Sequence, residues 1–302
     1  MNEKSLSAAP LQAALTATSE AVERVLDPYL SLPDGPEARV VECMRYSLFS
    51  GGKRLRPFLV LASAELFGVG KAQALRTAAA IECVHCYSLM HDDLPAMDDD
   101  DLRRGKPTAH IQFDEATAIL AGDALQTLAF QILSDSETHA DPSVRIELIS
   151  LMAHASGHHG MVGGQMIDLT AADHDLSEAE IYRLQQLKTG ELIRFSVEAG
   201  GILGRASPKM RQSLQFYARD LGLAFQIADD LLDVLGDEKT VGKATGKDAA
   251  AGKATLVSLM GVEKAARQAQ MLSDQAIAHL ADFDERASLL RAVAHFAVNR
   301  PN

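Results

Sequence analysis

Residues 91–105 read HDDLPAMDDDDLRRG, which places six aspartates within ten positions and, after one leucine, two arginines. A second acidic cluster, with aspartates at positions 229, 230 and 233, lies far along the chain inside an apolar helical pattern. Blocks of like charge often form only a solvated loop, so the first cluster alone does not define a site. Together, the two clusters predict a site for several metal ions on a helical scaffold.

The second cluster has the spacing of one helix face. Asp229 and Asp233 stand at i and i+4, which stacks their carboxylates one turn apart. Two such carboxylates repel each other unless a cation lies between them. Mg²⁺ is usually held by one or two carboxylates together with substrate phosphates. The spacing therefore predicts magnesium and a phosphate-bearing substrate.

The first cluster has a different spacing, because Asp92 and Asp98 are six residues apart. On one continuous helix these two side chains would point in different directions. Pro95 lies between them and has no N–H to donate to a helical hydrogen bond. We therefore expect a kink or a helix end near Pro95, which lets both carboxylates reach one cavity.

A basic loop precedes the first cluster in the sequence. Residues 51–57 read GGKRLRP, so Lys53 and Arg56 are expected in a glycine-containing loop at the start of a helix. Pro57 disfavours the helical conformation for the residue before it, and we expect Arg56 to be extended. Such a loop can grip an anion, although an ordinary basic surface turn fits the same residues.

Taken in order, these motifs resemble those of the trans (E-type) polyprenyl diphosphate synthases, and most closely those of the bacterial farnesyl diphosphate synthases. The resemblance spans about residues 45 to 260 and depends on the whole set rather than on one motif. Besides the two acidic clusters, its members are Gly51-Gly52-Lys53-Arg54-Leu55-Arg56-Pro57, Gly164-Gln165, Lys188-Thr189-Gly190, Phe225-Gln226, Gly242-Lys243, Gly246-Lys247-Asp248 and Gly252-Lys253-Ala254-Thr255.

The resemblance implies a reaction and a set of metal ligands. The chain would condense isopentenyl diphosphate with dimethylallyl and then geranyl diphosphate, head to tail, to give (E,E)-farnesyl diphosphate. Three Mg²⁺ ions, with Mn²⁺ as the other option, would be held by Asp92, Asp98 and Asp229. Outer or water-mediated contacts would come from Asp93, Asp230 and Asp233. The solvated members of the first cluster would be Asp99, Asp100 and Asp101.

The resemblance also divides the basic residues between two diphosphates. The allylic diphosphate would be bound by Arg103, Lys188, Lys243 and Lys253. Isopentenyl diphosphate would be bound by Lys53, Arg56, His85 and Arg104. Some of these residues also fit simpler roles. The paired arginines could neutralise the adjacent aspartates, and a single histidine on a helix is often a core residue. The stretch 239–253 could be a surface loop that becomes ordered when substrate binds.

Catalytic and product-length roles follow from the same resemblance. The Lys188 carbonyl, Thr189 and Gln226 would stabilise the allylic cation, and the proton would leave to the released diphosphate. Supporting contacts behind these groups would come from Gln165 and Asp168. Tyr87 and Ser88 are the fifth and fourth residues before Asp92 and would stop chain growth at fifteen carbons. A buried tyrosine that only packs between helices fits the same position.

Three other functions compete with this interpretation. A geranylgeranyl diphosphate synthase would differ at the cavity floor alone. A non-catalytic subunit of a heteromeric synthase tends to lose one aspartate cluster, and both are intact here. Terpene cyclases usually carry an Asn/Ser/Glu metal motif in place of the second cluster and bind one substrate, which would leave Lys53, Arg56 and Arg104 superfluous.

Composition narrows the choice of partners. The 302-residue chain has a formal net charge of −12, which argues against nucleic acid and anionic lipid. The N-terminus lacks a signal-peptide core, and no run is expected to approach the ~20 apolar residues of a membrane span. Cys43, Cys83 and Cys86 form no even framework and are expected to be buried, reduced thiols. We expect a soluble, cytoplasmic enzyme without membrane insertion, and the resemblance implies a homodimer.

Hydrophobic periodicity predicts helices along the whole chain and no strand or hairpin. The predicted helices span 5–31, 37–49, 57–67, 71–94, 115–133, 143–166, 177–199, 209–234, 258–280 and 284–298. Gly and Pro cluster only in short joints such as residues 33–36, so no interdomain linker is expected. The fold class is therefore all-α. We expect one polyprenyl synthase domain, residues 1–302, built as an isoprenoid synthase bundle of ten or more helices around a central cavity.

Overall fold

The computed structural model describes residues 8–171, 176–235 and 255–299, and helices dominate these ranges. The helices of the first half are α1 (Ala8–Leu26), η1 (Asp27–Leu30), α2 (Ala38–Leu48), α3 (Leu55–Glu65), α4 (Lys71–Asp92), α5 (Ala109–Gln112), α6 (Glu115–Ser134) and α7 (Pro142–Ser156). Those of the second half are α8 (Met161–Thr170), α9 (Glu178–Gln185), η3 (Gln186–Gly190), α10 (Glu191–Leu203), α11 (Pro208–Leu235), α14 (Leu256–Met260), α15 (Val262–His279), η4 (Ala281–Ala287) and α16 (Ser288–Val298). The predicted all-α class is confirmed.

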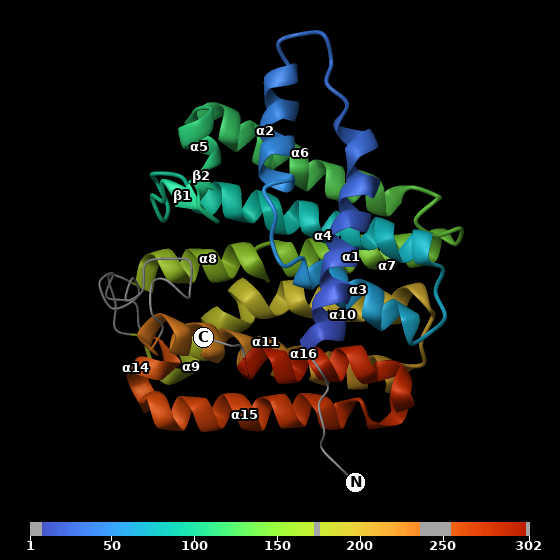
Figure 1. Ribbon diagram of the computed structural model, residues 1–302, viewed down its shortest axis with the longest axis vertical. Helices are drawn as coiled ribbons and strands as arrows, with labels where there is room; N and C mark the ends of the chain where they lie inside the picture. Colours follow the sequence, from blue (N-terminus) through green and yellow to red (C-terminus); the bar gives the residue numbers. More distant parts are fainter. Residues whose placement is uncertain (1–7, 172–175, 236–254, 300–302) are drawn as a thin grey trace.

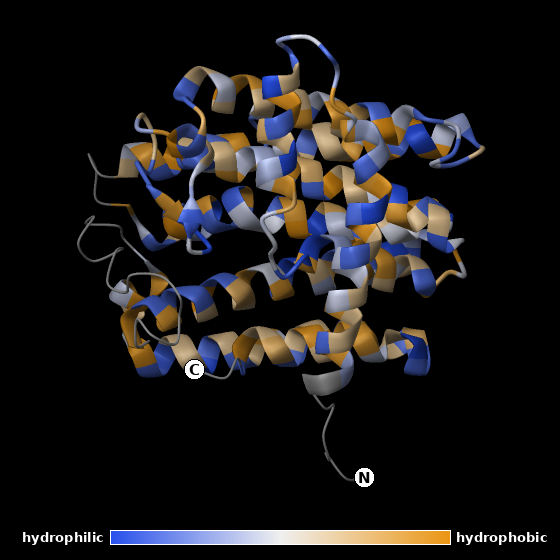
Figure 2. Ribbon diagram, turned by 45° about the horizontal axis from the view of Figure 1, so that its top comes forward, coloured by the Kyte–Doolittle hydropathy of each residue, from blue (hydrophilic) through white to orange (hydrophobic). Residues whose placement is uncertain are grey.

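The helices stack in layers across the molecule (Figure 1). α2, α5 and α6 lie at one edge of the stack, and α15 lies at the opposite edge. Between them, α4 packs against α6 and α3, α10 packs against α3, α7 and α11, and α11 packs against α15. The largest side chains of this core include Ile81, Phe195 and Tyr217, which are fully buried. Figure 2 shows hydrophobic and hydrophilic residues along each long helix, the two-sided pattern of helices that line a core.

Local chemistry sets several helix boundaries. The Asp114 carboxylate caps α6 by accepting a hydrogen bond from the Thr117 N–H at 2.8 Å. Ser177 and Glu180 form a reciprocal capping box at the start of α9. Both arrangements satisfy N–H groups that have no partner inside the helix. These short polar signals are present in the sequence, and α6 and α9 begin within one residue of the predicted positions.

Several sequence predictions were wrong in detail. The predicted helix 258–280 is divided at Gly261 (φ 81°, ψ 154°) into α14 and α15. The predicted helix 143–166 is two helices, because Gly157 leaves the helical region (φ −81°, ψ −161°) and α7 ends before it. The predicted helix 177–199 contains a π-helical turn, η3, and continues to Leu203. Arg56 is not extended, because α3 begins at Leu55 and Pro57 lies in its first turn, where a missing N–H is tolerated.

The structure also contains a small hairpin that was not predicted. β1 (Leu102–Arg103) pairs with β2 (Lys106–Pro107) in antiparallel register. Arg104 and Gly105 connect the strands, and both have positive φ (55° and 74°). A two-residue hairpin loop prefers this left-handed geometry because it matches the twist of the strands. Strands of two residues are too short to show an alternating pattern, which explains why periodicity did not predict them.

Helix α6 departs from one expectation about hydropathy. In the part of the chain that the structure describes, Glu115–Ser134 is the one helix long and apolar enough to cross a membrane by length and composition. The prediction that no run approaches a membrane span was therefore wrong for this segment. Half of its most apolar window is buried inside the molecule, and length and composition alone are weak evidence for a membrane span.

The three cysteines agree with expectation. Cys43, Cys83 and Cys86 are all buried and none forms a disulfide. Burial is the main cause that raises the pKa of Cys43 and Cys86 to about 12. Thiols with such a pKa remain protonated at neutral pH and are poor nucleophiles or metal ligands.

Candidate active site

The first aspartate cluster begins where a long helix stops. α4 ends at Asp92, before Pro95, as the sequence predicts. The Asp98 N–H donates a 2.9 Å hydrogen bond to the Asp92 carbonyl, so the backbones of the two predicted ligands lie side by side. The Asp92 carboxylate accepts a hydrogen bond from Gln165 of α8 and lies 4.0 Å from the Lys188 Nζ. Three segments distant in the sequence thus meet at Asp92.

Lys188 belongs to the π-helical turn η3, which packs tightly against α8. Its ammonium group donates a 2.6 Å hydrogen bond to the Asp168 carboxylate of α8. A Cβ atom added to Gly164 would lie 2.2 Å from the Lys188 backbone nitrogen. Only glycine therefore lets α8 approach η3 closely enough for these contacts. π-helical turns occur often at functional sites, and this one presents two predicted catalytic residues.

The other predicted catalytic residues continue the network toward the second cluster. The Thr189 hydroxyl donates a 3.0 Å hydrogen bond to the Gln226 Oε1 atom on α11. The Gln226 amide donates to one oxygen of Asp230 at 2.9 Å, and the Gln185 amide donates to the other at 3.0 Å. Because both Asp230 oxygens accept a side-chain amide, this buried carboxylate holds the Gln226 side chain in one orientation.

The two aspartate clusters are consequently linked through α8, η3 and α11. Asp229 lies next to Asp230, and its charge counteracts the effect of burial, which lowers the pKa of Arg56 at the start of α3. The charge of Asp229 therefore acts on Arg56 at the start of α3. Within the described residues, no three His, Cys, Asp or Glu side chains converge to hold a metal ion. Metal binding by Asp92, Asp98 and Asp229 stays a prediction, and it needs ligands from outside the protein, such as phosphate oxygens, to complete each ion's coordination.

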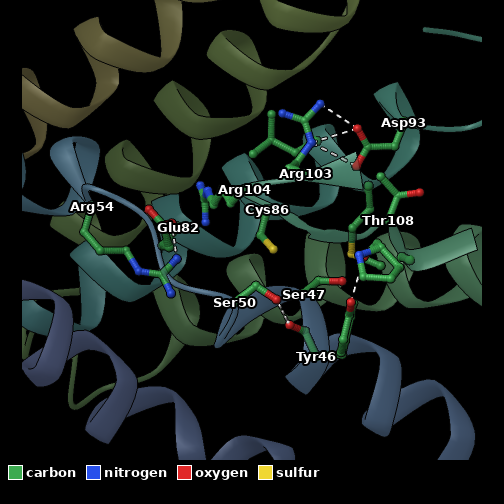
Figure 3. Close-up of a pocket in the computed structure, with 14 residues that line it drawn as sticks. Tyr46, Ser47, Ser50, Arg54, Glu82, Cys86, Asp93, Arg103, Arg104 and Thr108 are labelled. Carbon is green, nitrogen blue, oxygen red and sulfur yellow. Dashed lines mark hydrogen bonds and ion pairs between the residues drawn. The ribbon is translucent and has the colours of Figure 1, made fainter. Parts of the chain in front are cut away.

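Asp93 points to a different partner from Asp92. Its carboxylate is 3% exposed and accepts two hydrogen bonds from the Arg103 Nε at 2.7 and 2.9 Å (Figure 3). Burial raises the pKa of Asp93, and the hydrogen bond and charge of Arg103 oppose that rise. Arg103 thus neutralises an adjacent aspartate, as one of the two sequence interpretations holds. Its contact with an allylic diphosphate stays a prediction.

The predicted isopentenyl diphosphate ligands surround the start of α3. Arg56 lies 3.4 Å from the His85 Nε2 atom, and Arg104 donates a hydrogen bond to the Gly51 carbonyl. The pKa of His85 lies well below its usual value because of burial first, and then because of the neighbouring arginines, Arg56, Arg104, Arg103 and Arg54. A neutral imidazole can accept a hydrogen bond from a guanidinium. The Lys53 ammonium lies 5.9 Å from the centre of the Phe296 ring.

Two predicted ligands of the allylic diphosphate, Lys243 and Lys253, lie outside the described residues. The same holds for the stretch 239–253 to which they belong.

The predicted product-length residues lie on α4 between the core and the site. Tyr87 is 5% exposed, and its hydroxyl accepts a 3.2 Å hydrogen bond from Gln126 of α6. Its ring meets the His91 ring edge to face, with 5.8 Å between centroids. The Ser88 hydroxyl donates to the His85 carbonyl at 2.8 Å, so it remains on its own helix.

Sequence reasoning missed four residues that hold the site together. Gln185 orients Asp230, and Gln126 fixes the Tyr87 hydroxyl. Arg54 and Glu82 form a buried ion pair below the basic loop. A signal for Glu82 was present, because it is the one charged residue in the apolar run TAAAIECV, residues 77–84. An ionised residue at such a position needs a buried partner.

Comparisons with known proteins agree with this geometry. A family model described as "Polyprenyl synthetase" matches residues 37–294. The farnesyl diphosphate synthase of Escherichia coli strain K12 is 47% identical over 96% of this chain and 97% of its own length. The geranylgeranyl diphosphate synthase of Cyanophora paradoxa is 43% identical over 90% of this chain and 91% of its own. The crystal structure of an "FPP/GFPP synthase" from Zymomonas mobilis superimposes with a TM-score of 0.89 at 51% identity, covering 97% of this chain and all of that one.

Proposed function

The chain belongs to the polyprenyl synthetase family, and we propose from this premise that it is a trans-prenyltransferase that makes (E,E)-farnesyl diphosphate. In each round, the C–O bond between the allylic carbon and diphosphate breaks. A C–C bond forms between that carbon and the terminal alkene carbon of isopentenyl diphosphate, and one proton is lost. Dimethylallyl diphosphate is extended to geranyl diphosphate, which is extended once more.

The observation that carries the proposal is the network between the two aspartate clusters. At the first cluster, Gln165 and Lys188 contact Asp92. At the second cluster, Thr189 donates a hydrogen bond to Gln226, which donates one to Asp230. A diphosphate bound at Asp92 would place its allylic carbon near the Thr189 and Gln226 oxygens. Each oxygen is the negative end of a bond dipole and can stabilise a cation. The hydrogen bond between the two side chains limits their movement before the reaction.

The donor set supports Mg²⁺ as the cofactor. The predicted ligands Asp92, Asp98 and Asp229 offer oxygen atoms only, which suit a hard cation, and they are too dispersed to hold one ion together. Such a set suits three ions that arrive with the diphosphate, each held partly by phosphate oxygens. Bound Mg²⁺ supplies positive charge that compensates the departing diphosphate. The protein's own part is to orient the Asp92 carboxylate through Gln165 and Lys188.

Product length depends on Tyr87 in this proposal. Its hydroxyl accepts a hydrogen bond from Gln126 and its ring contacts His91, so it can act as a firm floor to the cavity. The strongest competing function is geranylgeranyl diphosphate synthesis, because the similar protein from Cyanophora paradoxa is a geranylgeranyl diphosphate synthase. A firm tyrosine at this position favours fifteen carbons over twenty.

The test is to incubate the purified chain with Mg²⁺, isopentenyl diphosphate and dimethylallyl diphosphate and to identify the products by chromatography. The expected product of the wild type is farnesyl diphosphate. Tyr87→Ala is expected to give longer products because the floor is removed, and Tyr182→Ala on α9 is the matched control. A twenty-carbon product from the wild type would favour the competing function. If Tyr87→Ala makes no product longer than fifteen carbons, Tyr87 is not the floor of the cavity.

We also propose a homodimer in the cytoplasm. Support for the dimer comes from α6, whose exposed side carries Ile119 and Leu120 at 42% and 55% exposure while its other side is buried in the core. No nucleic acid partner is proposed, because the net charge is −12.

A further inference from the structure

Arg54 has an unusual position in the basic loop. It lies between Lys53 and Arg56, and its backbone is left-handed (φ 48°), yet its side chain is only 2% exposed. The guanidinium donates hydrogen bonds to the Glu82 carboxylate on α4 (Figure 3) and to the Leu48 carbonyl at the end of α2. It also lies 3.4 Å from a carboxylate oxygen of Glu23 on α1. One buried side chain therefore connects the loop to three helices.

Glu82 is the buried negative charge beneath this group of arginines. Its side chain is 2% exposed, and its Oε2 atom has no hydrogen-bond partner in the ranges that the structure describes. Burial lowers the pKa of Arg56 and Arg104, and the Glu82 charge opposes that effect for both. Arg54, Glu82 and Arg104 line one small cavity of about 40 Å³. The negative charge of Glu82 thus favours the charged form of the guanidinium groups of Arg54, Arg56 and Arg104, and Glu82 contacts Arg54 directly.

A contribution to fold stability alone does not account for this ion pair. Two buried charges often stabilise a fold no more than apolar side chains of the same size would, because both lose their hydration. The left-handed backbone of Arg54 adds a further cost to the folded state. The arrangement does, however, fix where the loop lies relative to α4. Lys53 and Arg56 flank Arg54 closely, so a shift of Arg54 moves both predicted diphosphate ligands.

We propose that Arg54 and Glu82 are positioning residues for isopentenyl diphosphate: their buried ion pair holds the basic loop so that Lys53, Arg56 and Arg104 point at its diphosphate group. The inference rests on the proposed function. The pair does not touch the substrate. It sets the geometry and the charge balance of the residues that do, and it leaves the allylic diphosphate near Lys188 and Arg103 unaffected.

The experiment measures kcat and KM for each substrate in Arg54→Gln, Glu82→Gln and the double variant. Each single variant is expected to raise KM for isopentenyl diphosphate about tenfold, because small displacements of binding groups weaken binding strongly. KM for dimethylallyl diphosphate and kcat are expected to stay within about twofold. The double variant is expected to be no worse than the worse single variant, because partners in one contact are not additive.

Two further variants sharpen the result. Arg54→Lys keeps the charge and is expected to recover part of the loss. Glu23→Gln removes the more exposed partner of Arg54 and is the control, with KM values like those of the wild type. Should a single variant fail to fold because it leaves one charge of the pair buried, the double variant removes both charges of the pair and still reports on KM.

The results separate this inference from the function it rests on. Wild-type protein that forms no prenyl product refutes the proposed function. An active wild type whose Arg54 and Glu82 variants change KM for both substrates equally refutes the inference alone. Variants that only lower the melting temperature and leave both KM values unchanged refute it as well, because that is the behaviour of a purely structural pair.

Discussion

Asp92 is the residue at which the predicted chemistry is most concentrated, because Gln165 and Lys188 both approach its carboxylate. Asp92→Asn keeps the shape of the side chain and removes its charge. We expect kcat to fall by about 10²- to 10³-fold, the usual loss when one group that stabilises developing charge is removed. We also expect the Mg²⁺ concentration for half-maximal activity to rise. Steady-state kinetics at varied Mg²⁺ measures both quantities.

Asp99 supplies the matched control for this substitution. It belongs to the same acidic run, is exposed, and has a left-handed backbone (φ 52°) that asparagine adopts readily. Asp99→Asn is expected to have kinetics like those of the wild type. Equal losses in both variants would mean that the whole run acts only through its summed charge, and Asp92 would lose its specific role.

His85 makes the stability of the folded protein depend on pH. Its pKa in the folded state is well below the ordinary value, because of burial and the adjacent arginines. Between the folded pKa and an unfolded value near ~6.5, the unfolded chain binds more protons at this residue, so the free energy of unfolding falls as pH falls. Above pH ~6.5, both states are neutral at His85, and this effect vanishes.

His85→Gln tests this effect without adding charge. The variant is expected to lose less stability than the wild type between about pH 6.5 and about pH 5, because glutamine does not titrate. Urea unfolding at several pH values gives the free energies. Identical pH slopes for both proteins would show that His85 is protonated as easily in the folded state as in the unfolded chain.

At the scale of elements, the contact between α8 and η3 is the one most sensitive to side-chain size. A methyl group at Gly164 would meet the Lys188 backbone at 2.2 Å, so the two segments would have to separate. Gly164→Ala is expected to destabilise the fold by about 1 to 3 kcal/mol, as overpacking usually does. It should also lower kcat at least about tenfold, because Lys188 and Thr189 move with η3. Thermal unfolding and kinetics measure the two effects.

Gly190 provides the comparison within the same turn. A Cβ atom there would come no closer than 3.7 Å to the atoms around it, which is ordinary van der Waals contact. Gly190→Ala is expected to retain activity. A tenfold loss in this variant as well would mean that η3 tolerates no substitution, and the specific α8 contact would no longer explain the result for Gly164.

Helix boundaries were predictable where a single residue sets them, and less predictable where packing sets them. Pro95 marks the end of α4, and Asp114 and Ser177 mark helix starts. The break at Gly157 was missed although the sequence carried a signal for it, because residues 156–160 read SGHHG and interrupt the apolar pattern. The π-helical turn was missed because one extra residue per turn hardly alters hydrophobic periodicity over so short a span.

The site was predictable in its residue types and less so in its contacts. The aspartates, lysines and arginines could be named, because their spacing follows a recognisable order. The hydrogen bond from Gln165 to Asp92 and the pair of amides on Asp230 join distant segments. Such pairings depend on how helices cross, which a single sequence does not specify.

At the scale of the whole molecule, the exposed side of α6 makes the assembly testable. Ile119 and Leu120 are exposed residues of α6, and this helix lies at one edge of the helix stack while α15 lies at the opposite edge (Figure 1). The wild type is expected to sediment as a dimer, and the double variant Ile119→Glu with Leu120→Glu is expected to shift toward monomer, because charge is costly in an apolar interface. Met271→Glu on α15 is the control and should remain dimeric. A monomeric wild type at micromolar concentration would contradict the proposed homodimer.

Arg54 and Arg104 both have left-handed backbones, with φ of 48° and 55°, and both border the same small cavity. A non-glycine residue gives up about 1 to 2 kcal/mol in this conformation. Redesign for heat resistance that considers backbone conformation alone would therefore select glycine or asparagine at both positions, although removing Arg54 leaves the Glu82 charge buried without its ion-pair partner. The resulting protein would also lose two guanidinium groups from the lining of this cavity, one of them the predicted diphosphate ligand Arg104. Any effort to make a sturdier biocatalyst from this chain should keep positions 54 and 104 fixed.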